Sequence, residues 1–321
     1  MGERVVPSVE EIRHAAEHLD PVFAGSPLLS GTTLDAGGAR AVLKVETLNP
    51  IRSFKGRGAV TWMREVGSTA GGVVCASAGN FGQGLAYAAR AAGTSCRVFV
   101  GASANPAKVE SIRALGAEVE VGGPDYDSAI ASARQFASAS GLSFVQDGRD
   151  PWIAAGAATM ALEVTEAGTL PDVALVPVGN SALILGVAQW LRHRNPEVQV
   201  VGVCAENAAA PALSWRAGRV VTTASATTVA DGIAVREPFP ESVAAMLDHV
   251  DDMVLVSEEQ LRSATRWLAA DVGLLVEPAG AAGVAALQAD PDRYGGRTVL
   301  IPLCGGHLPP DALDWSEEWS R

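Results

Sequence analysis

The sequence predicts an α/β protein built from two doubly wound domains with mainly parallel sheets. Two observations lead to this fold class. Short valine-rich apolar runs alternate with longer alanine-rich stretches of helical period from about residue 41 onward, a pattern typical of parallel sheets covered by helices on both faces. The chain also has 321 residues, which exceeds the usual size of a single domain.

The apolar runs and the stretches between them give the expected elements in chain order. Strands are expected at 41–46, 71–77, 96–101, 117–122, 142–147, 172–179, 198–206, 252–257 and 297–306. Helices are expected at 81–93, 106–116, 125–141, 152–168, 181–194, 257–273 and 278–290. Several of these helices end in glycine, where a C-cap is expected, and Ser257 with Gln260 matches a capping box. By contrast, Gly58 is expected to spoil a helix that follows Lys55.

Two polar segments mark candidate crossings between the domains. Residues 67–72 are GSTAGG and residues 147–151 are DGRDP, and both are rich in residues that favour turns. We therefore expect residues 1–62 and 151–321 to form a large domain, and residues 63–150 to form a small inserted α/β domain. Ligands bind at the carboxyl ends of the strands in such folds, so the chemistry is expected in the loops that follow strands.

Composition and charge argue against several classes of protein. The formal charge of -12 and the lack of a long run of Lys and Arg predict no nucleic-acid partner. The most apolar segment, 172–191, contains Asp172, Pro177 and Asn180, which indicates a buried strand followed by a helix and not a membrane span. The N-terminus lacks the apolar stretch of a secretory signal, and the four cysteines are far apart without a CxxC pair. These observations predict a cytoplasmic protein.

Four strand-end loops carry the residues that predict chemistry. Lys55 lies in SFKGRGA, between Phe54 and Gly56. The other loops are SAGNFGQG at 77–84, PVGNSALILG at 177–186 and LCGGH at 303–307. Each could be an ordinary turn by itself. Together they combine a lysine amine with two candidate anion sites.

The glycines of the 77–84 loop argue against a dinucleotide site. Gly79, Gly82 and Gly84 give GxxGxG in place of GxGxxG, and no acidic residue ends the next strand. The backbone N–H groups at a helix start suit a carboxylate instead, with the amide of Asn80 beside them. The 177–186 loop offers similar donors to a phosphate, with the Ser181 hydroxyl available.

A reactive amine, a phosphate site, a carboxylate site and a soft polar group at Cys304 are the parts of a pyridoxal-phosphate site. Lysine forms the Schiff base with this cofactor, and burial beside Phe54 favours the neutral amine that attacks an aldehyde. The same amine can later serve as a base.

The order of the motifs resembles that of a known family. SPLL at 26–29, SFKGRGA at 53–59, SAGNFGQG, PVGNSAL, TVADGIAV at 228–235, EPAGAAG at 277–283 and the closing LCGG follow one another over nearly the whole chain. This pattern resembles the fold-type II pyridoxal-phosphate enzymes, which share the fold of tryptophan synthase β. Within them it is similar to the threonine/serine dehydratase branch, which includes serine racemase.

The resemblance implies a role for each matching residue. Lys55 is expected to be the catalytic Schiff-base lysine, with Phe54 on one face of the pyridine ring and Gly232 on the other. Asn80 would bind the phenolic oxygen, and Cys304 the ring nitrogen. The remaining contacts would be made to the substrate carboxylate by Ser77, Ala78, Gly79 and Asn80, and to the cofactor phosphate by Gly179, Asn180, Ser181, Ala182 and Leu183. No metal ligand is expected.

The implied reaction is an elimination. A neutral partner at the ring nitrogen, as Cys304 would be, favours loss of a group from Cβ. The resemblance therefore implies a dehydratase, or ammonia-lyase, that converts L-threonine, L-serine or a related β-hydroxy amino acid into a 2-oxo acid and ammonia. Serine racemase-like relatives carry a serine where this chain has Ala78, so racemisation is expected to be slow. Relatives are commonly dimers, and a homodimer is expected.

Other interpretations are open at this point. β-Replacement on an activated serine or threonine would use the same site, and a low-turnover pseudoenzyme that still binds the cofactor would follow from an impaired phosphate loop. That loop has Ser181 and Ala182 where the family usually has glycine, so a reshaped loop is expected. HAAEH at 14–18 fits a zinc-binding pattern, but an amphipathic surface helix is the better explanation.

Overall fold

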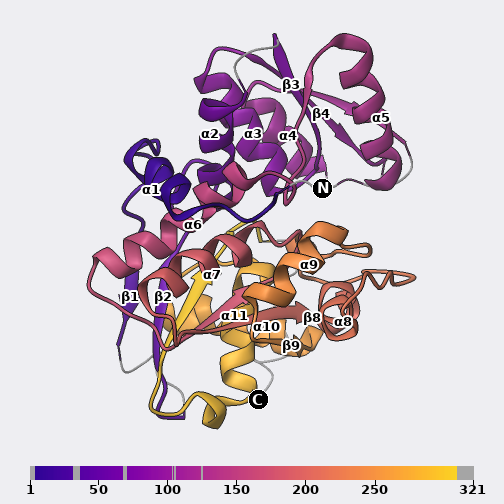
Figure 1. The fold of residues 1–321 in the computed structure, drawn as a ribbon. Helices are drawn as coiled ribbons and strands as arrows, with labels where there is room; N and C mark the ends of the chain where they lie inside the picture. The colour runs from indigo at the N-terminus through magenta and orange to yellow at the C-terminus, as the bar shows by residue number, and fades with distance from the viewer. Residues whose placement is uncertain are drawn as a thin grey trace.

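The computed structural model describes residues 4–31, 37–67, 71–102, 104, 106–123 and 126–308, which form two sheets (Figure 1). The larger sheet has the strand order β1-β2-β10-β7-β8-β9, and the smaller has the order β5-β4-β3-β6. Among the described strands only β1 runs antiparallel to its neighbour. The α/β fold class with mainly parallel sheets is confirmed.

All nine expected strands are present, and one short strand was not expected. The large sheet contains β1 (Leu28–Ser30), β2 (Arg40–Val45), β7 (Val173–Pro177), β8 (Gln199–Ala205), β9 (Asp252–Val256) and β10 (Thr298–Leu303). The small sheet contains β3 (Gly72–Ala76), β4 (Ser95–Val100), β5 (Glu118–Val121) and β6 (Ser143–Phe144). The strands of the small sheet thus all come from residues 72–144. The domain boundaries at 62/63 and 150/151 stay predictions.

The seven expected helices are also present, at α3 (Asn80–Ala91), α4 (Pro106–Ala114), α5 (Tyr126–Ser140), α6 (Pro151–Glu166), α7 (Ala182–Arg194), α10 (Glu258–Trp267) and α11 (Pro278–Ala289). The further helices are α1 (Val9–Glu17), α2 (Lys55–Glu65), α8 (Ala210–Ala217), α9 (Pro240–His249) and the short turns η2 (Glu206–Ala208), η3 (Asp231–Ile233), η4 (Leu268–Val272) and η5 (Pro291–Tyr294). The capping box of α10 is confirmed, because the Ser257 hydroxyl accepts a hydrogen bond from Gln260 N and Gln260 Oε1 accepts one from Ser257 N.

Helix α2 corrects one expectation. Gly58 does not spoil the helix that begins at Lys55, because its missing side chain is used for packing. A Cβ at Gly58 would lie 2.6 Å from the carbonyl oxygen of Ile153 in α6, and one at Gly56 would lie 2.1 Å from the Phe23 ring. The glycines therefore let α2 approach α6 and Phe23 closely, and this packing outweighs their low helix propensity.

The large sheet has a hydrophobic core on each face. Along β7, Val173 and Leu175 pack into one core together with α10 and α11. Ala174 and Val176 pack into the other core with α6 and α7. Successive side chains of a strand point to opposite faces, so this alternation shows a sheet covered on both sides. Figure 1 shows α6 between the large sheet and the small one, where it contacts both α2 and α7.

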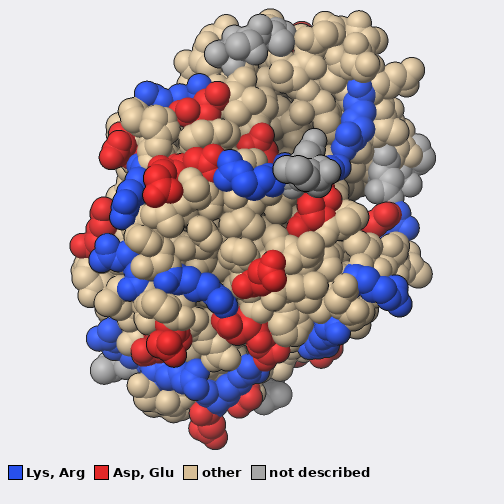
Figure 2. Space-filling model, in the orientation of Figure 1, with Lys and Arg blue, Asp and Glu red and all other residues tan. Residues whose placement is uncertain are grey.

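The surface carries charges of both signs. Acidic and basic side chains lie interspersed over the face drawn in Figure 2, which has no continuous basic stripe of the kind that tracks a nucleic-acid backbone. No helix in the described part of the chain combines the length and the apolar character that a membrane crossing requires.

Candidate active site

A cavity of about 1010 Å³ opens where strands of both sheets end. Ser77 follows β3, Gly179 comes shortly after β7, and Cys304 follows β10. Every predicted site residue lines this cavity: Phe54, Lys55, Ser77, Ala78, Gly79, Asn80, Gly179, Asn180, Ser181, Ala182, Leu183, Gly232 and Cys304. The structure therefore brings together residues that are up to 250 positions apart in the sequence.

Lys55 occupies the first position of α2, and its amine reaches into the cavity. The amine lies 4.6 Å from the centre of the Phe54 ring. Phe54 N donates a hydrogen bond to the carbonyl oxygen of Cys304 at 3.0 Å, and the Ser53 hydroxyl donates to the same oxygen at 3.1 Å. These hydrogen bonds hold the start of α2 against the end of β10, so the backbone of Lys55 is fixed in position.

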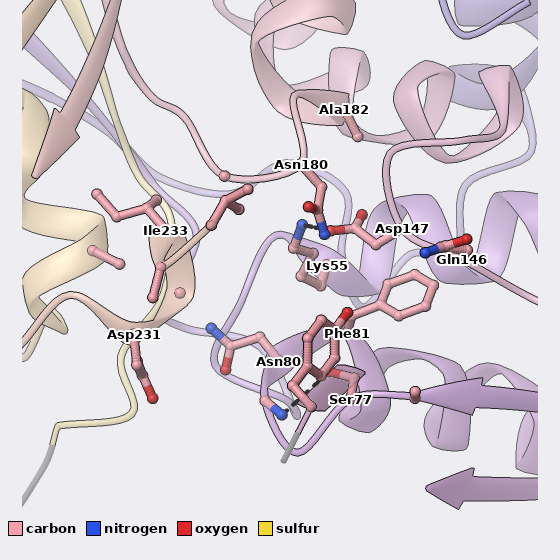
Figure 3. Close-up of a pocket in the computed structure, with 18 of the residues that line it drawn as sticks. Lys55, Ser77, Asn80, Phe81, Gln146, Asp147, Asn180, Ala182, Asp231 and Ile233 are labelled. Carbon is pink, nitrogen blue, oxygen red and sulfur yellow. Dashed lines mark hydrogen bonds and ion pairs between the residues drawn. The ribbon is translucent and has the colours of Figure 1, made fainter. Parts of the chain in front are cut away.

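Asp147 is a site residue that the sequence did not reveal. Its Oδ2 atom lies 2.7 Å from the Lys55 amine, and Figure 3 shows both side chains clustered with Asn180. Its second oxygen, Oδ1, is buried and has no hydrogen-bond partner among the described residues. The DGRDP segment was interpreted only as a domain crossing. Its place directly after β6 was the available signal, because strand ends are where ligands bind.

The predicted phosphate loop ends at the start of α7. Helix α7 begins at Ala182, so its first backbone N–H groups have no partner inside the helix and can bind an anion. Ser181 has a left-handed backbone with φ 71°, although serine tolerates this region poorly. Gly148 packs tightly against this loop, since a Cβ at Gly148 would lie 2.1 Å from the carbonyl oxygen of Asn180.

The predicted carboxylate loop precedes α3. Gly79 is the N-cap residue of this helix, and its N–H donates to the Ser77 hydroxyl at 3.2 Å. Gly82 allows the helix to approach the loop, because a Cβ there would lie 2.2 Å from the Ser77 carbonyl oxygen. The Asn80 amide donates to Glu277 at 2.8 Å. Glu277 also lines the cavity, and the EPAGAAG motif that contains it gave no role for it.

Cys304 presents a neutral thiol to the cavity. Its sulfur donates to the carbonyl oxygen of Pro302 at 3.4 Å. Burial raises the pKa of this thiol well above its ordinary range, and the negative charge of Glu277 adds to the effect. The thiol is therefore protonated at neutral pH, as the predicted partner of a pyridine nitrogen would be, and that role stays a prediction.

The cavity wall fits a flat ring with a phosphate tail. A Cβ at Gly232 would lie 3.0 Å from the Ala279 side chain and 3.3 Å from Glu277, so a side chain at this part of the wall would require its neighbours to shift. Gly232 and Phe54 both line the cavity, as a planar group held between them would require. The amine of Lys55 and the N-terminus of α7 then supply the partners for an aldehyde and a phosphate.

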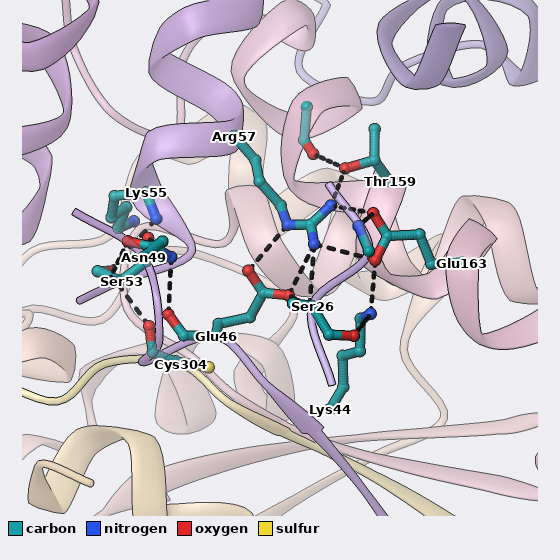
Figure 4. A network of polar contacts seen from close by, with 12 residues as sticks. Ser26, Lys44, Glu46, Asn49, Ser53, Lys55, Arg57, Thr159, Glu163 and Cys304 are labelled. Atoms are coloured by element: carbon teal, nitrogen blue, oxygen red, sulfur yellow. Dashed lines mark hydrogen bonds and ion pairs between the residues drawn. The ribbon is translucent and has the colours of Figure 1, made fainter. Parts of the chain in front are cut away.

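A buried ionic network holds the helix that carries Lys55 (Figure 4). Arg57 in α2 is fully buried and donates to Glu46 of β2 at 2.8 Å and to Glu163 of α6 at 2.7 Å. Lys44 is also paired with Glu163, which makes the network electrically neutral. Burial alone would lower the pKa of Arg57, but the two carboxylates raise it above its ordinary value, so the guanidinium remains charged.

The HAAEH segment forms the end of α1 and its C-cap residue, His18, and both histidines have other hydrogen-bond partners. His14 Nε2 lies 2.9 Å from Glu65 Oε1, and His18 Nδ1 bonds to the His14 carbonyl oxygen at 2.9 Å. Within the described ranges, no group of three or more His, Cys, Asp and Glu side chains is arranged to hold a metal ion. The helix has the amphipathic character expected of it, with Ile12 and Ala15 buried.

Comparison with known proteins agrees with this geometry. Residues 20–305 match the family model described as pyridoxal-phosphate dependent enzyme. The chain is 36% identical over 312 residues to the L-threonine ammonia-lyase of Thermotoga maritima, over 96% of this chain and 77% of that protein. It is 41% identical over 274 residues to the L-threonine ammonia-lyase of Geobacter sulfurreducens, over 83% of this chain and 66% of that protein.

A solved structure shows the same fold. The crystal structure of a T.th. threonine deaminase is similar with a TM-score of 0.88 and 31% identity, and the match covers 94% of this chain and 98% of that chain. The resemblance to fold-type II enzymes is thus confirmed, and pyridoxal phosphate is the cofactor of the family that it indicated. The chain belongs to the pyridoxal-phosphate-dependent enzyme family, in which it is a lyase.

Proposed function

We propose that this lyase dehydrates and deaminates a β-hydroxy amino acid, with L-threonine and L-serine as the first candidates, to a 2-oxo acid and ammonia. The observation that carries the proposal is the position of the Lys55 amine, in one cavity with the 77–80 loop and the start of α7. The similarity to two proteins named L-threonine ammonia-lyase supports the same reaction.

The 77–80 loop and Lys55 have separate roles in the proposed reaction. Pyridoxal phosphate, when bound, supplies the aldehyde that holds the substrate amine and draws electrons from Cα. The N–H groups of the 77–80 loop bind the substrate carboxylate, which orients Cα toward Lys55. Lys55 takes the Cα proton and gives a proton to the β-hydroxyl, which leaves as water, and hydrolysis of the resulting enamine gives the 2-oxo acid and ammonia.

Two residues favour elimination over other outcomes. The neutral thiol of Cys304 would not supply the positive charge at the ring nitrogen that long-lived carbanions need. Ala78 offers no acid to return a proton to Cα from the carboxylate loop, so we expect racemisation to be slow. Asp147, beside the Lys55 amine, is the acceptor that would hold this amine whenever the cofactor carbonyl is bound to substrate.

The test is 2-oxo acid release from L-threonine, L-serine and β-hydroxyaspartate, with L-alanine as the control that lacks a leaving group on Cβ. We expect release from at least one hydroxy amino acid and none from L-alanine. The Lys55→Ala variant should lose at least about 1,000-fold in turnover, because it lacks the base that takes the Cα proton.

Other outcomes would contradict the proposal. Serine consumed only when a thiol or amine nucleophile is added would indicate β-replacement. Absorbance of bound cofactor without oxo-acid release from any substrate would indicate a low-turnover protein. The homodimer and the cytoplasmic location also stay predictions, which sedimentation and cell fractionation can check.

A further inference from the structure

Glu277 is a buried carboxyl group in the cavity wall that the reaction described above does not use. It is the N-cap residue of α11, and only 3% of its surface is exposed. Its backbone N–H donates to the carbonyl oxygen of Gly305 at 2.8 Å, which fixes the residue to the segment after β10. A buried carboxyl group in a ligand cavity is a candidate for a functional role.

Both oxygens of this carboxyl group accept hydrogen bonds. Oε1 accepts from the Asn80 amide at 2.8 Å, and Oε2 accepts from the backbone N–H of His307 at 3.1 Å. The first bond joins α11 to the start of α3, where the predicted carboxylate loop ends. This pattern suits the ionised form, in which both oxygens are acceptors only, because protonation weakens one oxygen as an acceptor and adds an O–H that needs an acceptor of its own.

The carboxyl group has little freedom to turn. A Cβ at Gly305 would lie 2.3 Å from Oε1, and one at Gly232 would lie 3.3 Å from the same atom. The backbone therefore encloses the group closely on two sides. A change in its protonation must be accommodated by its two donors, and of these only Asn80 bonds through a side chain that can move.

Four titratable residues from three segments surround Glu277. Asp231 of η3 and Lys108 of α4 form an ion pair with each other, and both act electrostatically on the carboxyl group. The thiol of Cys304 after β10 is neutral, and the ring of His307 is turned away, toward the carbonyl oxygen of Ile51. Burial and Asp231 raise the pKa of Glu277 to about 7, against the opposing effects of Lys108 and the two hydrogen bonds.

We propose that Glu277 is a positioning residue that holds Asn80, and with it the 77–80 loop, in the substrate-binding orientation only while its carboxyl group is ionised. The inference rests on the proposed function, because it assigns substrate binding to that loop. This role of Glu277 would make substrate binding depend on pH through a residue that touches neither the reacting carbon nor Lys55.

The first test compares wild type with Glu277→Gln between pH 6 and 8. Glutamine has nearly the same size but does not titrate, and its NH₂ group faces one of the two donors. For wild type we expect kcat/KM to fall by up to about tenfold per pH unit below pH 7. For Glu277→Gln we expect a lower kcat/KM that lacks this dependence. A dependence that persists unchanged in Glu277→Gln would overturn the inference.

A second readout does not require turnover. Glycine carries the carboxylate and amine of a substrate but no β-hydroxyl, and its binding can be followed by the absorbance of the holoenzyme. Its affinity should fall with acidification more steeply in wild type than in Glu277→Gln. Equal pH dependence in the two proteins would refute the role of Glu277. If wild type bound glycine in this way but released no oxo acid, only the proposed reaction would fail.

The ion pair of Asp231 and Lys108 provides two further variants, which test the inference even if Glu277→Gln does not fold. The Asp231 side chain is 59% exposed, so Asp231→Asn should fold. Asp231→Asn removes a negative neighbour and should move the acid limb to lower pH, whereas Lys108→Gln removes a positive neighbour and should move it to higher pH. Shifts in the same direction, or no shift in either variant, would overturn the inference.

Discussion

The amine of Lys55 and the carboxylate of Asp147 lie 2.7 Å apart, one from the start of α2 and the other from the loop after β6. The loop that follows the last strand of the small sheet therefore contributes the counter-ion of Lys55, the lysine to which the proposed function assigns the chemistry. Asp147 lines the cavity, and its Oδ1 atom is buried without a hydrogen-bond partner among the described residues.

This ion pair predicts that Asp147 supports turnover. In Asp147→Asn, the Lys55 amine loses a charged acceptor, and hydrogen bonds to charged groups contribute about 1.5–3 kcal/mol. We expect kcat to fall by about 10- to 100-fold, whereas the protein keeps its bound cofactor. Steady-state rates and the absorbance of the holoenzyme measure the two quantities. An Asn variant that turns over at the parent rate would show that the pair has no catalytic role.

The contact of Gly148 with the phosphate loop predicts a specific loss of cofactor affinity. Gly148 and Gly168 have φ of 84° and 85°, but only Gly148 has atoms close to the position of a Cβ. Gly148→Ala and Gly168→Ala should therefore share a backbone strain of about 1 kcal/mol. Only Gly148→Ala should also displace Asn180 and weaken the binding of pyridoxal phosphate, by at least about tenfold.

Fluorescence titration of both variants with pyridoxal phosphate checks this expectation. Gly168→Ala is the control for strain, since nothing lies within 4 Å of its added carbon. Equal affinities in the two variants would mean that the loop after β6 does not shape the phosphate site.

The ionic network around Arg57 predicts a large effect on stability. Arg57→Ala leaves the buried carboxylate of Glu46 without its cation, whereas Glu163 keeps Lys44, and breaking a buried pair in this way costs about 3–5 kcal/mol. Arg64→Ala on the same helix is the matched control, because Arg64 is 54% exposed and should change stability by less than about 0.5 kcal/mol. Urea unfolding measures both, and similar values for the two variants would contradict the role of the network.

Glu277 predicts how stability depends on pH. Its pKa is raised from 4.5 to about 7, so between these values the folded state keeps a proton that the unfolded state has released. Its contribution to stability is therefore fully present below pH 4.5 and is lost as the pH rises through 7. Glu277→Gln removes this loss. The free energy of unfolding of the variant minus that of wild type should rise by up to about 3 kcal/mol between pH 4 and 8. A constant difference would disagree with the raised pKa.

Much of the fold could be predicted because the strands are short, apolar and regularly spaced. The strand β7 was visible as DVALVPVG, since both of its faces are buried and no polar residue interrupts it. Helix α2 was obscured because propensity disfavours Gly56 and Gly58, while their value for packing depends on Phe23 and α6, which only the tertiary structure brings near.

The site was predictable where backbone loops determine it, and less so where single side chains do. The loops at 77–80 and 179–183 follow strands and precede helices, which is visible in the sequence. Asp147 could be suspected only from its place directly after an expected strand, and the EPAGAAG motif that contains Glu277 does not by itself indicate a role for the carboxyl group. Their importance follows from burial and from partners at long sequence separation, such as Lys55 and Asn80.

Strand β10 pairs with β2 on one side and β7 on the other, and the carbonyl of Cys304 just beyond it holds the start of α2. During synthesis on the ribosome, the small sheet can therefore form early from neighbouring segments, while the large sheet has a vacant central position until residues 298–303 emerge. The nascent polypeptide completes the predicted coenzyme pocket only when that strand inserts, so we expect binding of the coenzyme to indicate that the large sheet is complete.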